Sequence, residues 1–236
     1  MAQSKISVII PTLNEEAHIG ALLKNLGQVQ GIEIIVVDGG STDRTLEICR
    51  LHAVNCLSGA PGRGTQMNLG AQKATGDILF FLHADSTVEI RVFNDIKKAV
   101  RNGYRWGCCT LFFTEKTVFF NLVAIASRLR VKFFSNCYGD QGIFCEKDLF
   151  FRAGGFPDFP FLEDLAFSHC MRRYQRAVMI PGKITTSTRR FRQNGLFRNL
   201  LKMQMVKALY TLGISPGKLL DIYQSSGKGL SCRRLL

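Results

Sequence analysis

The sequence is poor in acidic residues and lacks the cysteine spacing of a metal site. Its 236 residues include 18 Asp and Glu against 31 Lys and Arg. The eight cysteines include no Cys-x-x-Cys pair, and Cys108 and Cys109 are adjacent, so a structural zinc site is not expected. Unpatterned cysteines favour reduced thiols and a cytoplasmic protein.

Long apolar runs are also missing. No run approaches the ~20 residues that a membrane-spanning helix needs. The most apolar segment, Val118 to Ala126, contains Asn121 and is followed by Arg128, Arg130 and Lys132. A helix that lies on a membrane surface stays possible. The first five residues lead straight into a strand-like run, so we expect no signal peptide. Without a repeat, a low-complexity run or a linker, the chain suits a single domain.

The formal net charge of +13 indicates an anionic partner, such as a phosphorylated donor, a nucleic acid or an acidic membrane. Basic residues cluster late, at positions 171–176, 189–192 and 232–234. This uneven placement favours a local anion site over a surface that is basic for solubility. No recognised nucleic-acid-binding motif is present, so nucleic acid is not expected as a partner.

Strand and helix patterns alternate through the first hundred residues. Ile6–Ile10, Ile32–Val37 and Ile78–Leu82 are continuous apolar runs, typical of strands buried on both faces. Val54–Leu57 is a shorter strand candidate. Helices are expected at Glu15–Leu26, from Ser41 to about Leu51, and at Thr65–Ala74. Repeated strand–helix units predict an α/β fold with a mostly parallel central sheet and helices on both faces.

The pattern becomes less regular after Asp85. Further helices are expected at Val88–Val100, Val118–Val131 and Leu165–Tyr174, and strands at Trp106–Phe113, Ile143–Cys145 and Ala177–Ile180. Leu196–Leu212 forms a last helix with one apolar face. We therefore expect a nucleotide-binding half at about 1–87, an acceptor-side half at about 88–192 and a C-terminal helical appendage at about 193–236.

Carboxylates stand at turns after the predicted strands. Asp38 and Asp85 each follow an apolar run, Glu15 follows the first run, and Glu163-Asp164 opens a later helix. Ligands of open α/β sheets bind beyond the carboxyl ends of the strands. These acids are therefore candidates to contact a nucleotide, a metal or a proton.

The motifs, in this order, resemble glycosyltransferase family two with the type A nucleotide-sugar fold. The resemblance covers roughly residues 5 to 192 and is greatest to a bacterial subgroup of small, single-domain members. It implies a metal-dependent, inverting enzyme that moves a sugar from a nucleoside-diphosphate donor to an acceptor hydroxyl. The donor sugar, its base and the acceptor stay open.

The resemblance also implies which residues contact the donor. The family usually has a second acid where Gly39 stands, and an acid where His83 stands. Simple turn, cap or surface roles are the alternative for each of these residues. The implied contacts are Pro11, Thr12, Asn14 and Glu15; Asp38 and Gly39; Arg63 and Asn68; His83 and Ala84; Asp140 and Gln141; and Arg189 and Arg190.

The same resemblance makes Asp85 the metal ligand. Mn²⁺ or Mg²⁺ is the expected cofactor, because one carboxylate and two donor phosphates supply the oxygens that such ions prefer. In the pair Glu163-Asp164 the second acid corresponds to the general base, which takes a proton from the acceptor. The alternative is that both acids only stabilise a helix N-terminus.

Two other functions stay open. A sugar-phosphate nucleotidyltransferase also uses an α/β sheet and a metal, but its glycine-rich, lysine-ended signature is absent. A non-enzymatic basic module would bind a membrane or nucleic acid.

The Gln-x-x-Arg-Trp motif of processive synthases is absent, which argues against processive synthesis. Leu196–Leu212 is expected to contact an anionic membrane with a lipid-linked acceptor at its inner face, to form a homodimer, or to pack on the domain.

Overall fold

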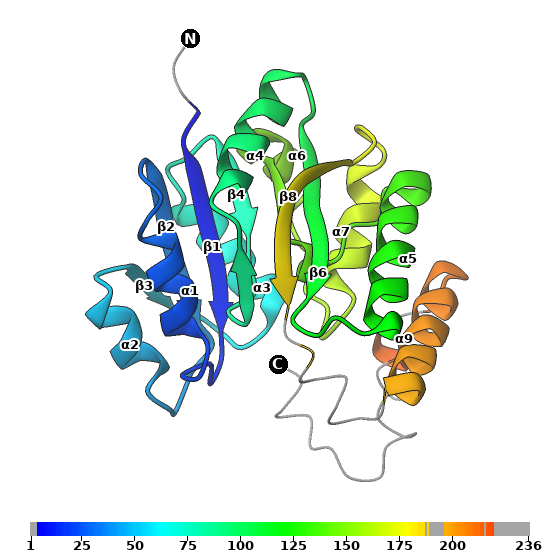
Figure 1. Cartoon of the computed structure of the whole chain (residues 1–236), viewed down its shortest axis with the longest axis horizontal. Coiled ribbons are helices and arrows are strands. Elements are labelled where there is room, and N and C mark those ends of the chain that lie inside the picture. The colour runs from blue at the N-terminus through cyan, green and yellow to red at the C-terminus, as the bar shows by residue number, and fades with distance from the viewer. Residues whose placement is uncertain (1–3, 187, 189–195, 215, 220–236) are drawn as a thin grey trace.

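The computed structural model describes residues 4–186, 188, 196–214 and 216–219, and for 196–202 it describes the helix alone. In this part of the chain, an eight-stranded sheet has the order β3-β2-β1-β4-β7-β6-β8-β5 (Figure 1). The first four strands in this order are parallel and come from the regular strand–helix units. Their bounds are β1 Ile6–Thr12, β2 Ile32–Asp38, β3 Asn55–Ser58 and β4 Ile78–Phe81.

The other half of the sheet is mixed, so the predicted mostly parallel sheet is only partly correct. Strand β7 is antiparallel to both β4 and β6, and β5 is antiparallel to β8, whereas β6 and β8 are parallel. Strand β7 is reversed because the chain enters it from the short helix η1, which lies beside the residues that follow β4. These elements are β5 Ser86–Val88, β6 Trp106–Phe113, β7 Ile143–Glu146, β8 Val178–Thr186 and η1 Gly139–Gln141.

Helices cover both faces of the sheet, as predicted. One face packs against α1 (Ile19–Leu26), α2 (Thr45–Leu51) and α4 (Arg91–Arg101), and the other against α3 (Arg63–Lys73), α6 (Lys147–Arg152) and α7 (Glu163–Met171). Two further helices, α5 (Val118–Phe134) and α9 (Leu196–Thr211), lie to the right of β6 in Figure 1.

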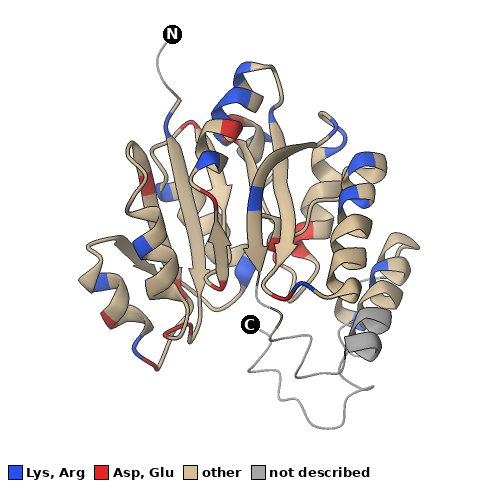
Figure 2. Ribbon diagram, viewed as in Figure 1, with Lys and Arg blue, Asp and Glu red and all other residues tan. Residues whose placement is uncertain are grey.

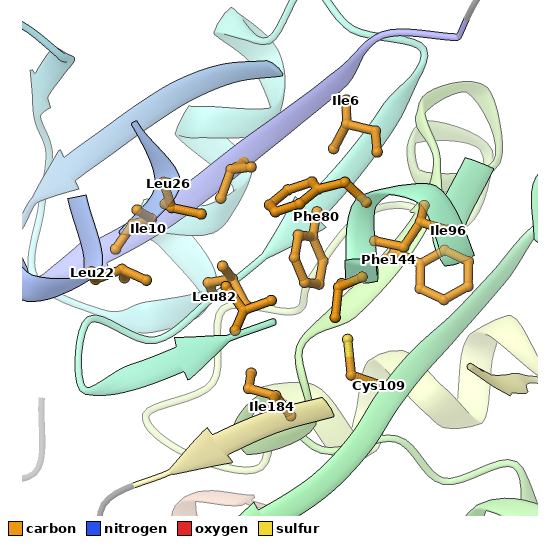
Figure 3. Close-up of a cluster of buried hydrophobic side chains, with 14 of the residues drawn as sticks. Ile6, Ile10, Leu22, Leu26, Phe80, Leu82, Ile96, Cys109, Phe144 and Ile184 are labelled. Atoms are coloured by element: carbon orange, nitrogen blue, oxygen red, sulfur yellow. The ribbon is translucent and has the colours of Figure 1, made fainter. Parts of the chain in front are cut away.

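Alternation along the strands builds the two core layers. Ile10 and Phe80 belong to the layer with α1 and α4, whereas Ile9 and Phe81 belong to the layer with α3 and α6. Neighbouring residues of a strand point to opposite faces, so a continuous apolar run fills both layers. Figure 3 shows the first layer, where Phe80 lies near Phe144.

Strand β8 is longer than predicted. Its expected end was Ile180, but the strand continues through Pro181 and Gly182 to Thr186. Its pairing with β6 shifts register between Cys109 and Thr110. A bulge of this kind accommodates residues that cannot join a regular ladder. The short elements β5 and α6 were not predicted.

Candidate active site

The ends of β1 and β2 fix Asp38 at the carboxyl edge of the sheet. Thr12 is in register with Asp38, and its Oγ1 donates a hydrogen bond of 3.2 Å to Asp38 Oδ1. Asp38 Oδ2 accepts from the backbone N–H groups of Gly40 (2.9 Å) and Ser41 (2.8 Å). The carboxylate is therefore buried and held in one orientation. Its contact with a nucleoside stays a prediction, as does that of Pro11, which is buried within β1.

Gln66, which the sequence did not single out, explains the glycine at position 39. Its side-chain N–H₂ donates to the backbone carbonyls of Thr12 (2.9 Å) and Val37 (2.7 Å). A Cβ atom at Gly39 would lie 3.2 Å from both Gln66 Nε2 and Pro61 Cα. A side chain at position 39 would need Gln66 or the Pro61 backbone to shift by a few tenths of an ångström, so glycine suits this packing.

The loops after β1 and β2 are tied together. Asn14 has a left-handed backbone (φ 56°), which asparagine tolerates better than most residues. Its Oδ1 accepts from the Thr42 N–H (2.8 Å), and its own N–H donates to Ser41 Oγ (2.9 Å). The Glu15 N–H donates to Thr45 Oγ1 (2.8 Å). The predicted donor residues Asn14 and Glu15 thus lie beside the Asp38 turn.

Arg63 and Glu163 form an ion pair. Arg63 Nε lies 2.8 Å from Glu163 Oε1, and only 3% of the Glu163 side chain is exposed. Burial raises the pKa of Glu163, and the guanidinium opposes that shift. The phosphate contact of Arg63 stays a prediction, because this guanidinium faces the carboxylate.

Asn68 has a role in the fold. Its Nδ2 donates to the Phe156 carbonyl (2.8 Å), and its Oδ1 accepts from the Phe156 N–H (2.9 Å). The two bonds join α3 to the turn that precedes α7. The predicted donor contact of Asn68 stays untested.

Asp164 lies where β4, η1 and α7 meet. It is half-buried, and its two oxygens accept from the backbone N–H groups of Gly139 (2.9 Å) and Leu165 (2.7 Å). A Cβ atom at Gly139 would lie 2.5 Å from His83 Nε2, so the imidazole ring packs on this glycine. Leu162, which precedes the acid pair, has φ 65°. A non-glycine residue in this region is strained, a feature common at functional sites.

Asp85 and Asp140 complete a group of carboxylates around Asp164. Asp85 is half-buried, while the adjacent Ala84 is a core residue. The pKa of Asp140 is raised by burial first, and the charges of Asp164 and Asp85 add to the shift while Arg130 and Lys207 oppose it. Half-buried Asp85 offers the carboxylate oxygens that a divalent cation prefers, so it fits such an ion only with further ligands from a donor. Within the described residues, no group of three or more His, Cys, Asp and Glu forms a metal centre by itself.

Two cations near these acids were missed by the sequence. Lys207 Nζ lies 3.7 Å from the centroid of the Tyr138 ring, and Arg130 Cζ lies 3.5 Å from it. Burial lowers the pKa of Lys207 to about 8. Arg130 also donates to Gln141, a predicted donor residue that is buried. Lys207 and Tyr138 are far apart along the chain, so their contact gives no local sequence signal.

Part of the apolar face predicted for the C-terminal helix packs on the rest of the chain. Val206 of α9 is buried with Tyr138, Leu162 and Leu165, and Tyr210 packs against this cluster. The predicted donor residues Arg189 and Arg190 lie outside the described residues.

One protein family and several known proteins are similar to this chain. The family described as glycosyl transferase family 2 matches residues 7–156. A "PGL/p-HBAD biosynthesis glycosyltransferase" of Mycobacterium bovis is 40% identical over 97 residues, which are 37% of this chain and 38% of that protein. The Staphylococcus aureus poly(ribitol-phosphate) beta-N-acetylglucosaminyltransferase TarS is 31% identical over 104 residues, which are 39% of this chain and 18% of TarS. The alignments thus span well under half of these relatives.

Solved structures share the fold. TarS in complex with UDP-GlcNAc has a TM-score of 0.63 at 19% identity, over 78% of this chain and 58% of the TarS chain. The mannosyltransferase PcManGT from Pyrobaculum calidifontis, in complex with GDP-Man and Mn²⁺, has a TM-score of 0.67 at 19% identity, over 89% of this chain and 63% of that one. With an α/β sheet of this topology and a family match over most of it, the chain belongs to glycosyl transferase family 2.

Proposed function

We propose that this chain is a metal-dependent, inverting glycosyltransferase that moves a sugar from a nucleoside-diphosphate donor to an acceptor hydroxyl. The observation that carries the proposal is the approach of Asp164 to the loop of Asp85. Gly139 donates to Asp164 and packs under His83, two residues before Asp85, at the edge of the sheet that also holds Asp38. Family membership supports the reaction class. The structural neighbours bind UDP-GlcNAc and GDP-Man, so uracil and guanine donors are both candidates.

Asp85 would hold Mn²⁺ or Mg²⁺ together with the donor phosphates. Such an ion neutralises the charge that develops on the leaving diphosphate. The chain's own contribution is a half-buried carboxylate at the end of β4, close enough to Asp140 to affect its pKa. The loops that carry Asn14, Glu15 and Asp38 would hold the nucleoside, and Arg189 and Arg190 would cover the diphosphate.

Asp164 is the better candidate for the general base than Glu163. Glu163 is buried and paired with Arg63, so it has no free path to an acceptor. Asp164 is half-buried and accepts hydrogen bonds from two backbone N–H groups. In this proposal Asp164 takes the acceptor proton, and the Arg63–Glu163 pair positions the first turn of α7.

The wider setting of the enzyme is also a proposal. We place both halves of the sheet and the C-terminal appendage in one domain. The protein would act in the cytoplasm, at the inner face of a membrane that carries a lipid-linked acceptor. The alternative to membrane contact is that the same surface forms a homodimer.

The test compares Asp164→Asn with Asp148→Asn. Both acids stand in the first turn of a helix, but Asp148 is exposed on α6. We expect Asp164→Asn to bind donor normally and to release nucleoside diphosphate ~10²–10⁴-fold more slowly. The Asp148→Asn control should match wild type. If Asp164→Asn loses donor affinity as much as it loses turnover, Asp164 has a structural or metal-binding role. If Asp164→Asn turns over normally, another residue is the base.

The same assay separates the other enzyme class. A sugar-phosphate nucleotidyltransferase would consume a nucleoside triphosphate and a sugar phosphate and release pyrophosphate. A basic binding module would turn over neither set of substrates. Release of nucleoside diphosphate from a sugar donor in the presence of Mn²⁺ is expected only of the glycosyltransferase.

A further inference from the structure

Helix α5 exposes a stripe of large apolar side chains. The stripe residues are 48% to 77% exposed. Five of them recur at steps of three or four residues, which places them on one face of the helix. They are Val118, Leu122, Ile125, Leu129 and Phe133, with Phe134 beside them.

The core does not require this stripe. The helix already buries an opposite face, formed by Phe120, Ala124, Ser127 and Val131. Scattered apolar residues on a surface are ordinary, but a contiguous apolar patch marks an interaction site. Helix α5 is thus apolar on both faces, and only one face has a partner in the described residues.

The surroundings of the stripe are basic. Helix α5 contains no Asp or Glu, and Figure 2 shows basic but no acidic segments along it. At its C-terminal end, Arg172 Nη1 donates to the Phe134 carbonyl (3.1 Å), and Arg176 Nη2 donates to the Lys132 carbonyl (3.1 Å). Earlier on the helix, Arg128 lies 5.0 Å over the Phe112 ring. The stripe is therefore flanked by exposed or half-exposed cations.

We propose that this stripe, from Val118 to Phe134, docks on the surface of an anionic lipid bilayer. An apolar helix face flanked by Lys and Arg is the composition that binds such a surface, with the helix lying in the interface plane. No helix in the described residues is long and apolar enough to cross a membrane. We place the docking surface on α5, because part of the apolar face of α9, including Val206, is turned into the protein.

Charge favours lipid over a second copy of the chain. Each copy carries a formal net charge of +13, and the stripe offers no carboxylate to pair with the cations of another copy. Like charges brought together at an interface disfavour association. Anionic headgroups would instead neutralise Lys132, Arg172 and Arg176. This inference does not depend on the donor or on the reaction.

The test is co-sedimentation of the full chain with vesicles. One set contains phosphatidylcholine and phosphatidylglycerol, and the other phosphatidylcholine alone. Wild type should pellet with the anionic set at low salt, and less at high salt. Leu122→Ser with Leu129→Ser should weaken binding at least ~tenfold, because two large side chains leave the lipid. The matched control is Leu51→Ser, whose side chain is 77% exposed on α2, on the opposite side of the sheet.

Charge variants separate the basic flank from net charge. Arg128→Gln with Lys132→Gln should lower binding and its dependence on salt. Lys98→Gln with Arg101→Gln removes the same charge from α4 and should have the smaller effect. Equal effects of the two pairs would overturn the role of the flank.

Three results would overturn the proposal. The first is no pelleting of wild type with anionic vesicles at low salt. The second is equal binding by the Leu122/Leu129 variant and the Leu51 control. The third is a dimer in light scattering that becomes a monomer in the Leu122/Leu129 variant, because the stripe would then be a contact between copies. Circular dichroism on every variant checks that the helices are retained.

Discussion

Replacing Arg63 with methionine should destabilise the fold strongly at neutral pH. The change leaves the Glu163 carboxylate without its partner, and the side chain is only 3% exposed. Removing one partner of a buried ion pair typically costs about 3–5 kcal/mol, because the other charge stays buried. Glu163→Gln should cost less, about 1–2 kcal/mol, since the Arg63 side chain is 28% exposed and reaches water. The double variant should resemble Glu163→Gln.

The stability lost in Arg63→Met should become smaller as pH falls. Burial raises the pKa of Glu163, and without the guanidinium nothing from Arg63 opposes that shift. Between the ordinary value of 4.5 and the raised value, the folded variant holds a proton that the unfolded chain has lost. Stability in this window therefore falls as pH rises. Glu163→Gln removes the titrating group and should remove this pH dependence.

Urea unfolding followed by tryptophan fluorescence measures these differences. Trp106 is the single tryptophan, is fully buried, and lies edge-on to Phe167 of α7 with ring centroids 6.4 Å apart. It therefore reports on the helix that carries Glu163. If Arg63→Met loses no more stability than Glu163→Gln, or loses the same amount at every pH, Glu163 is not a buried, paired carboxylate.

Two further predictions concern packing and pH. Gly107→Ala should lower the free energy of unfolding by about 3 kcal/mol, because the new Cβ would lie 2.0 Å from the Val178 carbonyl oxygen. In the same urea assay, Gly217→Ala should be near neutral, because its new Cβ would meet nothing within 4 Å. Lys207 has a pKa of about 8 in the folded chain, against an ordinary value of 10.5. Between pH 8 and 10.5 the unfolded chain therefore binds more protons than the folded chain. As pH rises through this window, wild type should gain stability relative to Lys207→Met. A constant difference between these two proteins across that window would contradict the burial of Lys207.

The predictable part of the fold is the part with continuous apolar runs. Strands β1, β2 and β4 were expected within two residues of their observed ends, because a strand buried on both faces is a continuous run of apolar residues. Strand β5 has three residues and depends on β8 for its pairing. The second half of β8 was not predicted, because Pro181-Gly182 is as typical of a turn as of a bulge within a strand.

The predictable part of the site follows from topology. The position of Asp38 at a strand end was inferred from sequence alone, because parallel strands share one carboxyl edge. Partners could not be inferred in this way. Arg63 and Glu163 are 100 residues apart, and Lys207 meets Tyr138 only through the packing of α9. Gln66 has no local signal, because its partners are backbone carbonyls of two other elements.

Calorimetric titration of nucleotide sugars tests the central claim most directly. Wild type and Asp85→Asn would each be titrated with UDP- and GDP-linked sugars, with Mn²⁺ and without it, beside Asp148→Asn as the control. The account predicts that wild type and the control bind at least one donor only when Mn²⁺ is present, and that Asp85→Asn loses this binding while keeping its fold. Donor binding by Asp85→Asn with unchanged dependence on Mn²⁺, or no binding of any donor by wild type, would contradict it.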